Sequence, residues 1–482
     1  MANLEGYLIV DIGTGNARVA VATTDGNILS IKRENVHYES DINYEDSIYF
    51  DPEELWEQIL RLSKEALLEA GNIIIKAITA TSQREGIVIV NKKGNSTLGM
   101  PNIDHRGRAW DASIANKDLI FQLSGRYPTS LFSAYKLVGL SELYPLLFAE
   151  IEFFLSISDW IQFKFSGFAC YEHSQASETL LYDVEKKQWS EELLALFDLS
   201  GNILPPLYHA GSILGPILPE VADLLNISKD AAVVVGGGDT QLAIRSMEPS
   251  TNDLVIVSGT TTPIIKLVDN YVVDEDQRTW TSRHIVEGQY TLEANAGVTG
   301  LNYQRLKEIF YPNESYDVIE QELELATYSQ CVASLGSLIA DEEVPLIKGG
   351  FIFNAPVSHQ LTRGSFVFAI LWDIACSIYE NYKFLNEVSS HNENYIWACG
   401  GGIESKKLRQ FIANLFGKSI RVRDTFRQAS VLGGVFVCND ALGIQNKHPQ
   451  LLEETFPQNH EEFEKLYHEW KNARKTFKQV VH

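Results

Sequence analysis

A glycine-rich turn with polar side chains follows the first apolar stretch of the chain. Asp11 ends that stretch, Thr14, Gly15 and Asn16 form the turn, and Arg18 comes two residues later. Glycines in such a turn let backbone N–H groups approach a phosphate without hindrance from a Cβ atom. An aspartate at a strand end can hold Mg²⁺, and an arginine can pair with phosphate oxygens. The motif predicts a phosphate-binding turn, although a plain β-hairpin would also explain it.

A carboxylate follows three consecutive glycines near the middle of the chain. Residues 236–238 are all glycine, and Asp239, Thr240 and Gln241 come next. In phosphoryl transfer to an alcohol, an aspartate commonly orients the hydroxyl and accepts its proton. An aspartate before a helix that begins at Gln241 is also an ordinary N-cap. Asp239 is therefore predicted to be a catalytic base, a helix cap, or both.

Two more glycine turns follow in the second half. Gly259 and Thr260 belong to a hydroxyl-rich turn that suits transferring phosphates, and Gly401 belongs to a glycine triplet that opens a helix, with Ser405 close behind. A triplet of this kind leaves room for a flat base or ribose on the backbone, although alone it is an ordinary strand-to-helix loop. The order of the four motifs is far more specific than any one of them.

The apolar pattern predicts the elements that must position these turns. A β-meander is expected over 7–11, 19–22 and a third short strand, followed by a helix over 51–70 and a strand over 73–81. Later elements are expected as strands over 232–235, 254–258 and 396–399 and as a helix over 407–416. From Glu453 onward the charged composition predicts a surface helix.

The arrangement of strand, Gly-Thr turn and strand occurs twice, near residues 13 and 259. Such a weak internal repeat is typical of two duplicated domains that face each other across a cleft. The polar stretch 245–252 is the best boundary. We therefore expect a first α/β domain over 1–246 and a second over 252–482, with a helical tail at the C-terminus.

Acidic side chains outnumber basic ones in the 482-residue chain, 63 against 40, and the formal net charge is −23. Such a chain repels nucleic acid and anionic membrane surfaces, so neither is an expected partner. Apolar residues make up 45% of the sequence, which is enough to bury sizeable cores.

The five cysteines are odd in number and widely spaced, without a CxxC motif. This argues against a disulfide framework and a zinc site and fits a reducing cytoplasm. The N-terminus shows no signal-peptide pattern, and no stretch approaches the ~18 apolar residues of a membrane span. The chain is expected to be cytoplasmic.

Together the motifs resemble the FGGY family of carbohydrate kinases, from about residue 6 to 440. The resemblance implies a two-domain actin/hexokinase-like (ribonuclease H-like) ATPase fold with an interdomain cleft, and ATP and Mg²⁺ as cofactors. It implies that Asp11 holds the metal and that Asp239 is the catalytic base. The residues that it assigns to ATP and its phosphates are Thr14, Gly15, Asn16, Arg18, Gly259, Thr260, Gly300, Gly401 and Ser405.

The sugar side of the resemblance rests on two segments. Arg84 and Glu85 follow a predicted strand, in a Gln-Arg-Glu similar to that of glycerol kinases, and could clamp adjacent hydroxyls of a polyol. A structural ion pair at a strand end is the alternative. Asp104 lies in a turn that resembles the family's Asp-x-Arg and is expected to bind a substrate hydroxyl, as is Gln241 beside Asp239. His105 is expected to be a surface histidine, and Arg106 a structural residue.

Within the family, the segments 84–88, 102–106, 157–160 and 233–242 look most like autoinducer-2 kinases. Those enzymes phosphorylate a primary hydroxyl of an open-chain five-carbon dihydroxy diketone. A gluconate, xylulose or other pentose or polyol kinase is the alternative, and a non-catalytic actin-like ATPase or a sugar sensor is the alternative from another class. A small sugar or polyol is the expected partner, and a homodimer is compatible with this interpretation.

The sequence also departs from the family pattern. The late signature is blurred over 364–380, Arg427 and Gln428 stand where an acidic residue is common, and Leu131 stands where a tyrosine lines the glycerol pocket. These departures concern the substrate rather than the four phosphate-site motifs.

Overall fold

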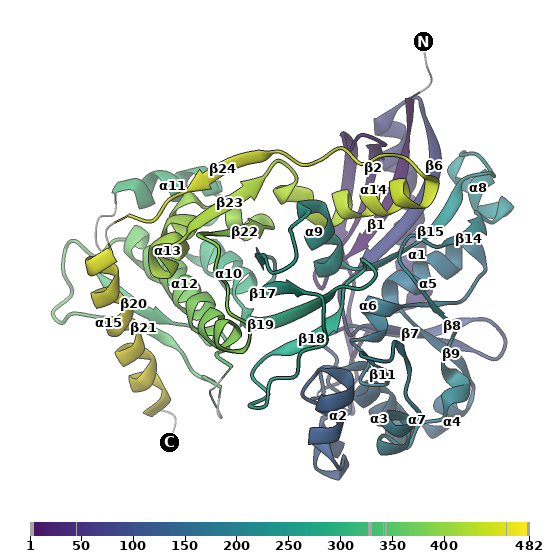
Figure 1. Ribbon diagram of the computed structural model, residues 1–482, viewed down its shortest axis with the longest axis horizontal. Helices are drawn as coiled ribbons and strands as arrows, with labels where there is room; N and C mark the ends of the chain where they lie inside the picture. The colour runs from purple at the N-terminus through teal and green to yellow at the C-terminus, as the bar shows by residue number, and fades with distance from the viewer. Residues whose placement is uncertain are drawn as a thin grey trace.

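Two lobes, each built around a mixed β-sheet with packed helices, lie side by side (Figure 1). The computed structural model describes residues 4–44, 46–325, 330–340, 342, 345–458 and 460–479. The first sheet has the strand order β14-β15-β6-β1-β2-β3, and the second has the order β18-β19-β17-β16-β22-β23-β24.

The first sheet brings three strand ends together. Its strands are β1 (Leu4–Ile12), β2 (Asn16–Thr23), β3 (Ile28–Asn35), β6 (Ile73–Ser82), β14 (Ile213–Pro216) and β15 (Ala232–Gly238). β1 runs antiparallel to β2 and parallel to β6, which in turn runs parallel to β15. The register aligns Ile12 with Ser82 and Ser82 with Gly238. The turns that follow these three strands therefore meet at one edge of the sheet.

Helices and a small second sheet complete the first lobe. Helix α1 (Pro52–Ala70) begins where the Asp51 side chain accepts hydrogen bonds from the backbone N–H groups of Glu53 and Glu54, and it buries Leu55, Ile59 and Leu62. The small sheet consists of β7 (Ile87–Asn91), β8 (Ser96–Met100) and β9 (Ile151–Ser156). The other helices are α2 (Lys117–Ser124), α3 (Ser133–Leu143), α4 (Pro145–Ala149), α5 (Ile157–Ser166), α6 (His173–Ala176), α7 (Glu191–Leu196) and α8 (Pro219–Leu225). Short strand pairs are β4 (Glu39–Ser40) with β5 (Ile48–Tyr49), β10 (Tyr171–Glu172) with β13 (Leu207–Tyr208), and β11 (Tyr182–Asp183) with β12 (Gln188–Trp189).

The second sheet repeats the arrangement of strand ends. Its strands are β16 (Leu254–Val257), β17 (Thr261–Val268), β18 (Trp280–Arg283), β19 (Tyr290–Val298), β22 (Tyr395–Cys399), β23 (Ser419–Arg423) and β24 (Leu451–Thr455). β16 runs parallel to β22, with Val257 opposite Cys399, so the turns after these strands are neighbours. Its helices are α10 (Gly300–Phe310), α11 (Tyr316–Leu325), α12 (Arg363–Val388) and α13 (Lys406–Phe416), and a hairpin is formed by β20 (Cys331–Ser334) and β21 (Gly350–Phe353).

Two helices connect the lobes. Helix α9 (Asp239–Met247) leaves the first sheet, and α14 (Ala429–Leu442) returns from the second lobe and packs on β1, β6 and β15 (Figure 1). A Cβ atom on Gly433 would lie 2.0 Å from the carbonyl oxygen of Leu242, so glycine allows the close contact between the two helices. After α9 the chain enters the second sheet at Leu254. The division into domains at 1–246 and 252–482 remains a prediction, and it counts α14 with the second lobe although α14 packs on the first sheet.

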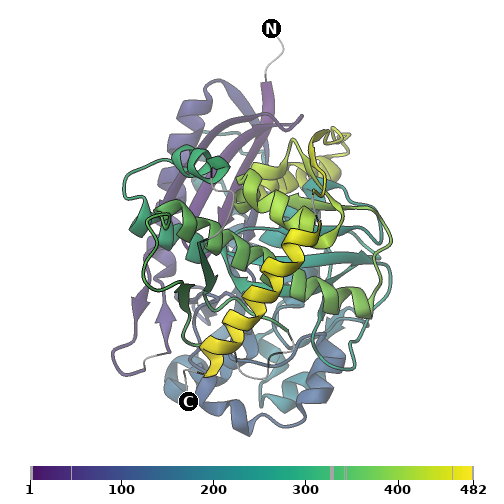
Figure 2. The ribbon, with the colours of Figure 1, turned by 90° about the vertical axis from the view of Figure 1, so that its left-hand side faces the viewer.

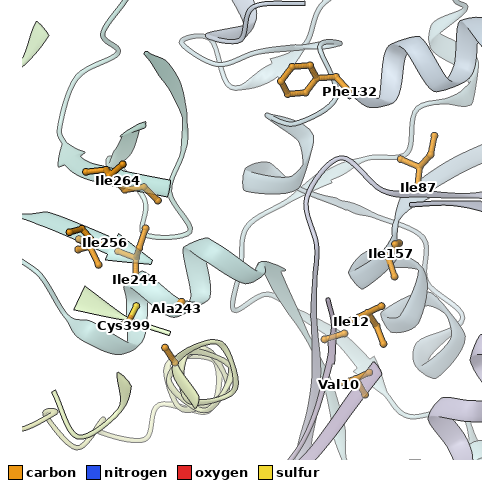
Figure 3. Close-up of a cluster of buried hydrophobic side chains, with 14 of the residues drawn as sticks. Val10, Ile12, Ile87, Phe132, Ile157, Ala243, Ile244, Ile256, Ile264 and Cys399 are labelled. Carbon is orange, nitrogen blue, oxygen red and sulfur yellow. The ribbon is translucent and has the colours of Figure 1, made fainter. Parts of the chain in front are cut away.

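One buried apolar cluster runs through both lobes. Figure 3 shows part of it, with Val10 and Ile87 of the first lobe and Ile256 and Ile264 of the second. All five cysteines are buried. Among the described residues, no helix has the length and apolar content that crossing a membrane requires.

The prediction for the C-terminal segment is corrected by the structure. Residues Leu451–Thr455 form β24 at the edge of the second sheet, and the helix α15 begins only at His460 and ends at Gln479. α15 lies across the second lobe (Figure 2). Its Trp470 is fully buried and donates a hydrogen bond of 2.7 Å to Asp373 of α12. Phe463, Leu466 and Tyr467 pack against the same core, and the charged composition of the segment concealed this apolar face.

Candidate active site

A cavity of about 760 Å³ is lined by residues of both lobes. Eight of the predicted site residues line it: Thr14, Arg18, Arg84, Glu85, Asp239, Gly259, Thr260 and Gly401. The seven predicted residues outside the lining are Asp11, Gly15, Asn16, Asp104, Gln241, Gly300 and Ser405. The turns that follow β1, β15, β16 and β22 therefore face one crevice, as the order of motifs predicted.

The first turn is fixed by an ion pair. Arg18 pairs with Asp11 across the β1–β2 hairpin, and it donates hydrogen bonds to Gln428 (2.6 Å) and to Ser430 (2.9 Å) of α14. The Ser430 hydroxyl donates to Asp11 at 2.6 Å. Asp11 is thus buried behind the cavity lining, and Arg18 remains partly exposed at the cavity. The sequence did not identify Gln428 and Ser430 as partners, because they lie more than 400 residues away.

The second turn depends on close backbone contact. The Gly259 N–H donates to Thr261 O at 3.0 Å, and Leu301 N–H donates to Thr260 O at 3.3 Å. A Cβ atom on Gly300 would lie 2.0 Å from the Gly259 carbonyl oxygen, so the start of α10 can approach the turn only with glycine there. Gly300 supports the turn from behind and does not line the cavity.

The glycine triplet after β22 lies beside the second turn. The Gly402 N–H donates to Ser258 O at 3.1 Å, which places Gly400 and Gly401 at the cavity wall. Ser405 accepts a hydrogen bond of 3.3 Å from the Leu408 N–H and caps α13. Its side chain is buried and outside the lining of the cavity, and the contact of Ser405 with adenosine stays a prediction.

Asp239 is the first residue of α9, and Gly238 is the N-cap. The prediction that the helix begins at Gln241 after an aspartate cap is therefore corrected. One carboxylate oxygen of Asp239 accepts the Thr240 N–H at 2.6 Å. Burial, together with the charge of Asp11, raises the pKa of Asp239 to about 6, while the charge of Arg84 acts in the opposite direction. A general base works best when its pKa lies near the operating pH.

Arg84 makes a bidentate ion pair with a glutamate of the other lobe. Its NH1 lies 2.6 Å and its NH2 3.0 Å from the two carboxylate oxygens of Glu293 on β19. Its Nε lies 4.0 Å from Glu85, which has a left-handed backbone φ of 63°. Such a conformation is uncommon for glutamate and is found at functional sites. The alternative interpretation of Arg84 as an ion-pair residue is thus correct in part, with a partner that the sequence did not suggest.

A second buried arginine extends this cluster. Arg126 pairs with Glu178 and lies 3.8 Å from Glu293, while Glu178 lies 3.6 Å from Arg84. Burial raises the pKa of Glu85 to about 8. Glu293 differs, because the charges of Arg84 and Arg126 overcome burial and lower its pKa to about 2. A sequence signal for Glu293 exists in retrospect: it alternates with Asn295 on β19, which places both side chains on one face.

The turn after β8 differs from its prediction. Asp104 is fully buried, and its carboxylate accepts hydrogen bonds from Arg106 (2.9 Å) and from the Ile48 N–H (2.8 Å). The geometry therefore gives Asp104 a structural role with Arg106 and no contact with the cavity. His105, expected at the surface, lines the cavity instead, and burial lowers its pKa to about 4. His105 is neutral at pH 7.

Gln241 is buried beneath the glycine strand end. Its Oε1 would lie 2.5 Å from a Cβ atom on Gly238, and its amide atoms have no hydrogen-bond partner among the described residues. Gln83, which the sequence placed only beside Arg84, lines the cavity and accepts the Asn102 N–H at 3.0 Å. Asn102 also bonds Thr14 at 3.0 Å, so Gln83 and Asn102 connect the phosphate turn to the sugar-side loop.

Asp239 lines the cavity and Asp11 is buried outside its lining, and both are carboxylates of the kind that Mg²⁺ takes as ligands. Asp11 and Asp239 interact electrostatically, since the charge of one raises the pKa of the other, and a divalent cation would relieve that repulsion. Within the described parts of the chain, no three His, Cys, Asp or Glu side chains gather as a ligand cage. Mg²⁺ usually keeps several waters and takes one or two carboxylates together with substrate phosphates.

Comparison with known proteins agrees with this geometry. The N-terminal domain of the FGGY family of carbohydrate kinases matches residues 6–245, and the C-terminal domain of that family matches residues 336–442. The chain is 45% identical to "Putative sugar kinase YoaC" of Bacillus subtilis (strain 168), over 99% of this chain and 98% of that protein. It is 25% identical to a xylulose kinase of Staphylococcus epidermidis, over 99% and 98% of the two chains. It is 23% identical to an autoinducer-2 kinase of Yersinia enterocolitica, over 91% and 87%.

Two solved structures share the fold. Ligand-bound xylulose kinase from Lactobacillus acidophilus superposes with a TM-score of 0.83 at 18% identity, covering 99% of this chain and 98% of that one. Plasmodium falciparum glycerol kinase with ADP also gives 0.83, at 19% identity and with 98% of each chain covered. The predicted two-domain actin/hexokinase-like ATPase fold is confirmed. Xylulose and autoinducer-2 kinases are about equally distant relatives, so the resemblance to the latter stays a prediction.

Proposed function

The chain belongs to the FGGY family of carbohydrate kinases, and on this basis we propose that it transfers the γ-phosphate of ATP to a primary hydroxyl of a small open-chain sugar, polyol or dihydroxy ketone. That it is a sugar kinase follows from the family and from the relative at 45% identity. The acceptor and the residue roles are the proposed part.

One observation supports the proposal above the others. A single cavity is lined by two phosphate-type turns from different lobes, at Thr14 and Thr260, and by a carboxylate whose pKa is about 6. The same cavity holds Arg84 and Glu85, which can bind hydroxyls. A non-catalytic ATPase has no need of a base beside hydroxyl ligands. A sugar sensor has no need of turns suited to a triphosphate.

In the proposed reaction, Asp239 accepts the proton of the acceptor hydroxyl. The hydroxyl oxygen forms a new bond to the γ-phosphorus, the bond from that phosphorus to the β–γ bridging oxygen breaks, and ADP leaves. Arg18 and the N–H groups of the Gly259 turn offset the charge that builds on the transferred group. When bound near Asp11, Mg²⁺ would supply further charge neutralisation on the phosphates.

Arg84 and Glu85 orient the acceptor in this proposal. Arg84 donates and Glu85 exchanges hydrogen bonds with neighbouring hydroxyls, so the terminal hydroxyl lies toward Asp239. Closure of the lobes would exclude water, which otherwise competes as an acceptor. Within the first lobe, the hydrogen bonds from Asn102 to Gln83 and to Thr14 join the proposed sugar side to the phosphate turn.

A pentose kinase is the second candidate, because xylulose kinases are among the relatives. The test for both is substrate-dependent ADP release, measured with a coupled assay across dihydroxypentanedione, xylulose, gluconate, erythritol and glycerol. The proposal expects ADP release that depends on one of the hydroxyl compounds. Slow hydrolysis that no compound stimulates would instead support an actin-like ATPase, and thermal stabilisation by a sugar without ATP consumption would support a sensor.

A further inference from the structure

The sugar end of the cavity is lined by charged groups that already have partners. This end consists of Arg84, Glu85, Asp239, Glu293 and Asn295, all of which line the cavity. Glu293 is 1% exposed, and its carboxylate is held by Arg84 on one side and by the Asn295 amide (3.0 Å) on the other. A fork of two parallel N–H···O bonds is among the strongest and most directional pairings of a carboxylate.

Among the described residues that line the cavity, no cation without a carboxylate partner is available to a substrate carboxylate. Each arginine in the lining has a carboxylate partner no more than 3.5 Å away: Arg18 with Asp11, Arg84 with Glu293, Arg278 with Glu387 and Arg427 with Glu404. His105 is the remaining basic side chain of the described lining, and its burial keeps it neutral. Beneath the sugar end, two arginines, Arg84 and Arg126, face three glutamates, Glu85, Glu178 and Glu293.

A neutral hydroxyl can be accommodated where a carboxylate cannot. The Nε of Arg84 lies 4.0 Å from Glu85 Oε1, too far for a direct hydrogen bond but close enough for one oxygen to bridge the two groups. A hydroxyl in that position would accept from Arg84 and donate to Glu85 without disturbing Glu293. A carboxylate would have to displace Glu293 from Arg84 and leave it buried without its main partner, which is strongly unfavourable.

From this arrangement we infer that the substrate is an uncharged polyol or ketose where it meets Arg84 and Glu85, and that Glu293 is the residue that excludes sugar acids. The inference rests on the proposed kinase function and narrows its substrate class. The triphosphate is not affected, because in the proposed binding mode it meets the glycine turns and Mg²⁺ and does not depend on Arg84. Glu293 determines specificity here by occupying Arg84, not by touching the reacting atoms.

The experiment compares matched pairs of neutral and acidic substrates in the wild-type enzyme. Glucitol is paired with gluconate, xylitol and xylulose with xylonate, erythritol with erythronate and glycerol with glycerate, and kcat/KM is measured for each by coupled ADP release. We expect the best neutral substrate to exceed its matched acid at least 100-fold. Preference for any acid over its neutral partner overturns the inference and leaves the kinase proposal intact. The absence of substrate-dependent ADP release with every compound overturns both.

Three variants test the part assigned to Glu293. Glu293→Gln keeps the shape but removes the charge, so it should reduce the ratio of neutral to acid kcat/KM at least tenfold. Glu293→Asp keeps the charge and should retain the ratio, which separates charge from packing. Glu387→Gln, which removes the partner of another cavity arginine, should also retain it. An unchanged ratio of neutral to acid kcat/KM in Glu293→Gln, or an equal loss of that ratio in Glu387→Gln, contradicts the role of Glu293. If Glu293→Gln does not fold, the ratios of Glu293→Asp and of the wild type still test the exclusion of acids.

Discussion

Replacement of Arg84 by methionine should lower the free energy of unfolding by about 3 kcal/mol, because it leaves Glu293 buried without its bidentate partner. Methionine is unbranched and fills much of the space of the arginine stem. Glu293 would keep only the Asn295 amide and the more distant Arg126, whose NH1 lies 3.8 Å away. The two lobes would lose a bidentate buried ion pair at the same time.

The magnitude follows from the burial of the pair. Breaking a buried ion pair by removal of one partner costs about 3–5 kcal/mol, and the remaining partners of Glu293 favour the lower end. The pKa of Glu293 agrees in direction, because the charges of Arg84 and Arg126 and the Asn295 amide overcome burial and lower it from its usual 4.5 to about 2. Since the pKa is depressed in the folded state, this stability is fully present above pH 4.5 and is lost as the pH falls toward 2.

Thermal unfolding followed by tryptophan fluorescence is the assay. At about 2–4 °C per kcal/mol for large domains, the midpoint should fall by roughly 6–12 °C at pH 7. At pH 3 the difference in stability between wild type and variant should shrink to about half. The reason is that pH 3 lies between the folded-state pKa of about 2 and the usual 4.5, the range in which this stabilisation is lost. Arg61→Met, which removes an exposed partner of Glu34, is the control and should leave the midpoint nearly unchanged. A midpoint for the Arg84 variant within about 1 °C of wild type at pH 7, or a difference that does not depend on pH, would refute the reasoning.

Three further outcomes are expected. The kcat/KM of the wild-type enzyme should fall about tenfold per pH unit below pH 6, because only ionised Asp239 accepts a proton and its pKa is about 6; a flat profile between pH 5 and pH 7 argues against this base. Gly300→Ala places a Cβ atom 2.0 Å from the carbonyl oxygen of Gly259 in the neighbouring turn. The KM for ATP should therefore rise at least tenfold, while the KM for the sugar changes little. Gly201→Ala is the control and should behave as wild type, because its added Cβ makes only an ordinary contact. Trp470→Ala should cost about 3–5 kcal/mol in denaturant unfolding, because the indole is fully buried, whereas the exposed Lys475→Ala should cost almost nothing.

Local features of the sequence were sufficient to predict the turns and strands of the site. The glycine turns near residues 14, 237, 259 and 401 all lie at the ends of strands in the structure. Glycine, threonine and aspartate punctuate strand ends for reasons that act within a few residues. The parallel pairing of β1, β6 and β15 brings together the turns near residues 14 and 237, and the parallel pairing of β16 with β22 brings together those near 259 and 401.

Partners distant in the sequence could not be predicted in the same way. Glu293 lies 209 residues from Arg84, and Ser430 lies 419 residues from Asp11, so no spacing rule connects them. Asp104 and His105 were misjudged for a related reason: the burial of a turn depends on which helix packs over it. In the same way, the path of α14 back to the first sheet follows from packing of both lobes and left no mark in the local pattern.

The most direct test of the account is single-turnover phosphoryl transfer by Asp239→Asn, with ATP affinity measured on the same preparation. If the cavity shared by the two lobes carries the reaction with Asp239 as its base, transfer to the best acceptor falls by about 10²–10⁴-fold, while ATP binds within about twofold of wild type. Transfer near the wild-type rate in that variant would contradict the account.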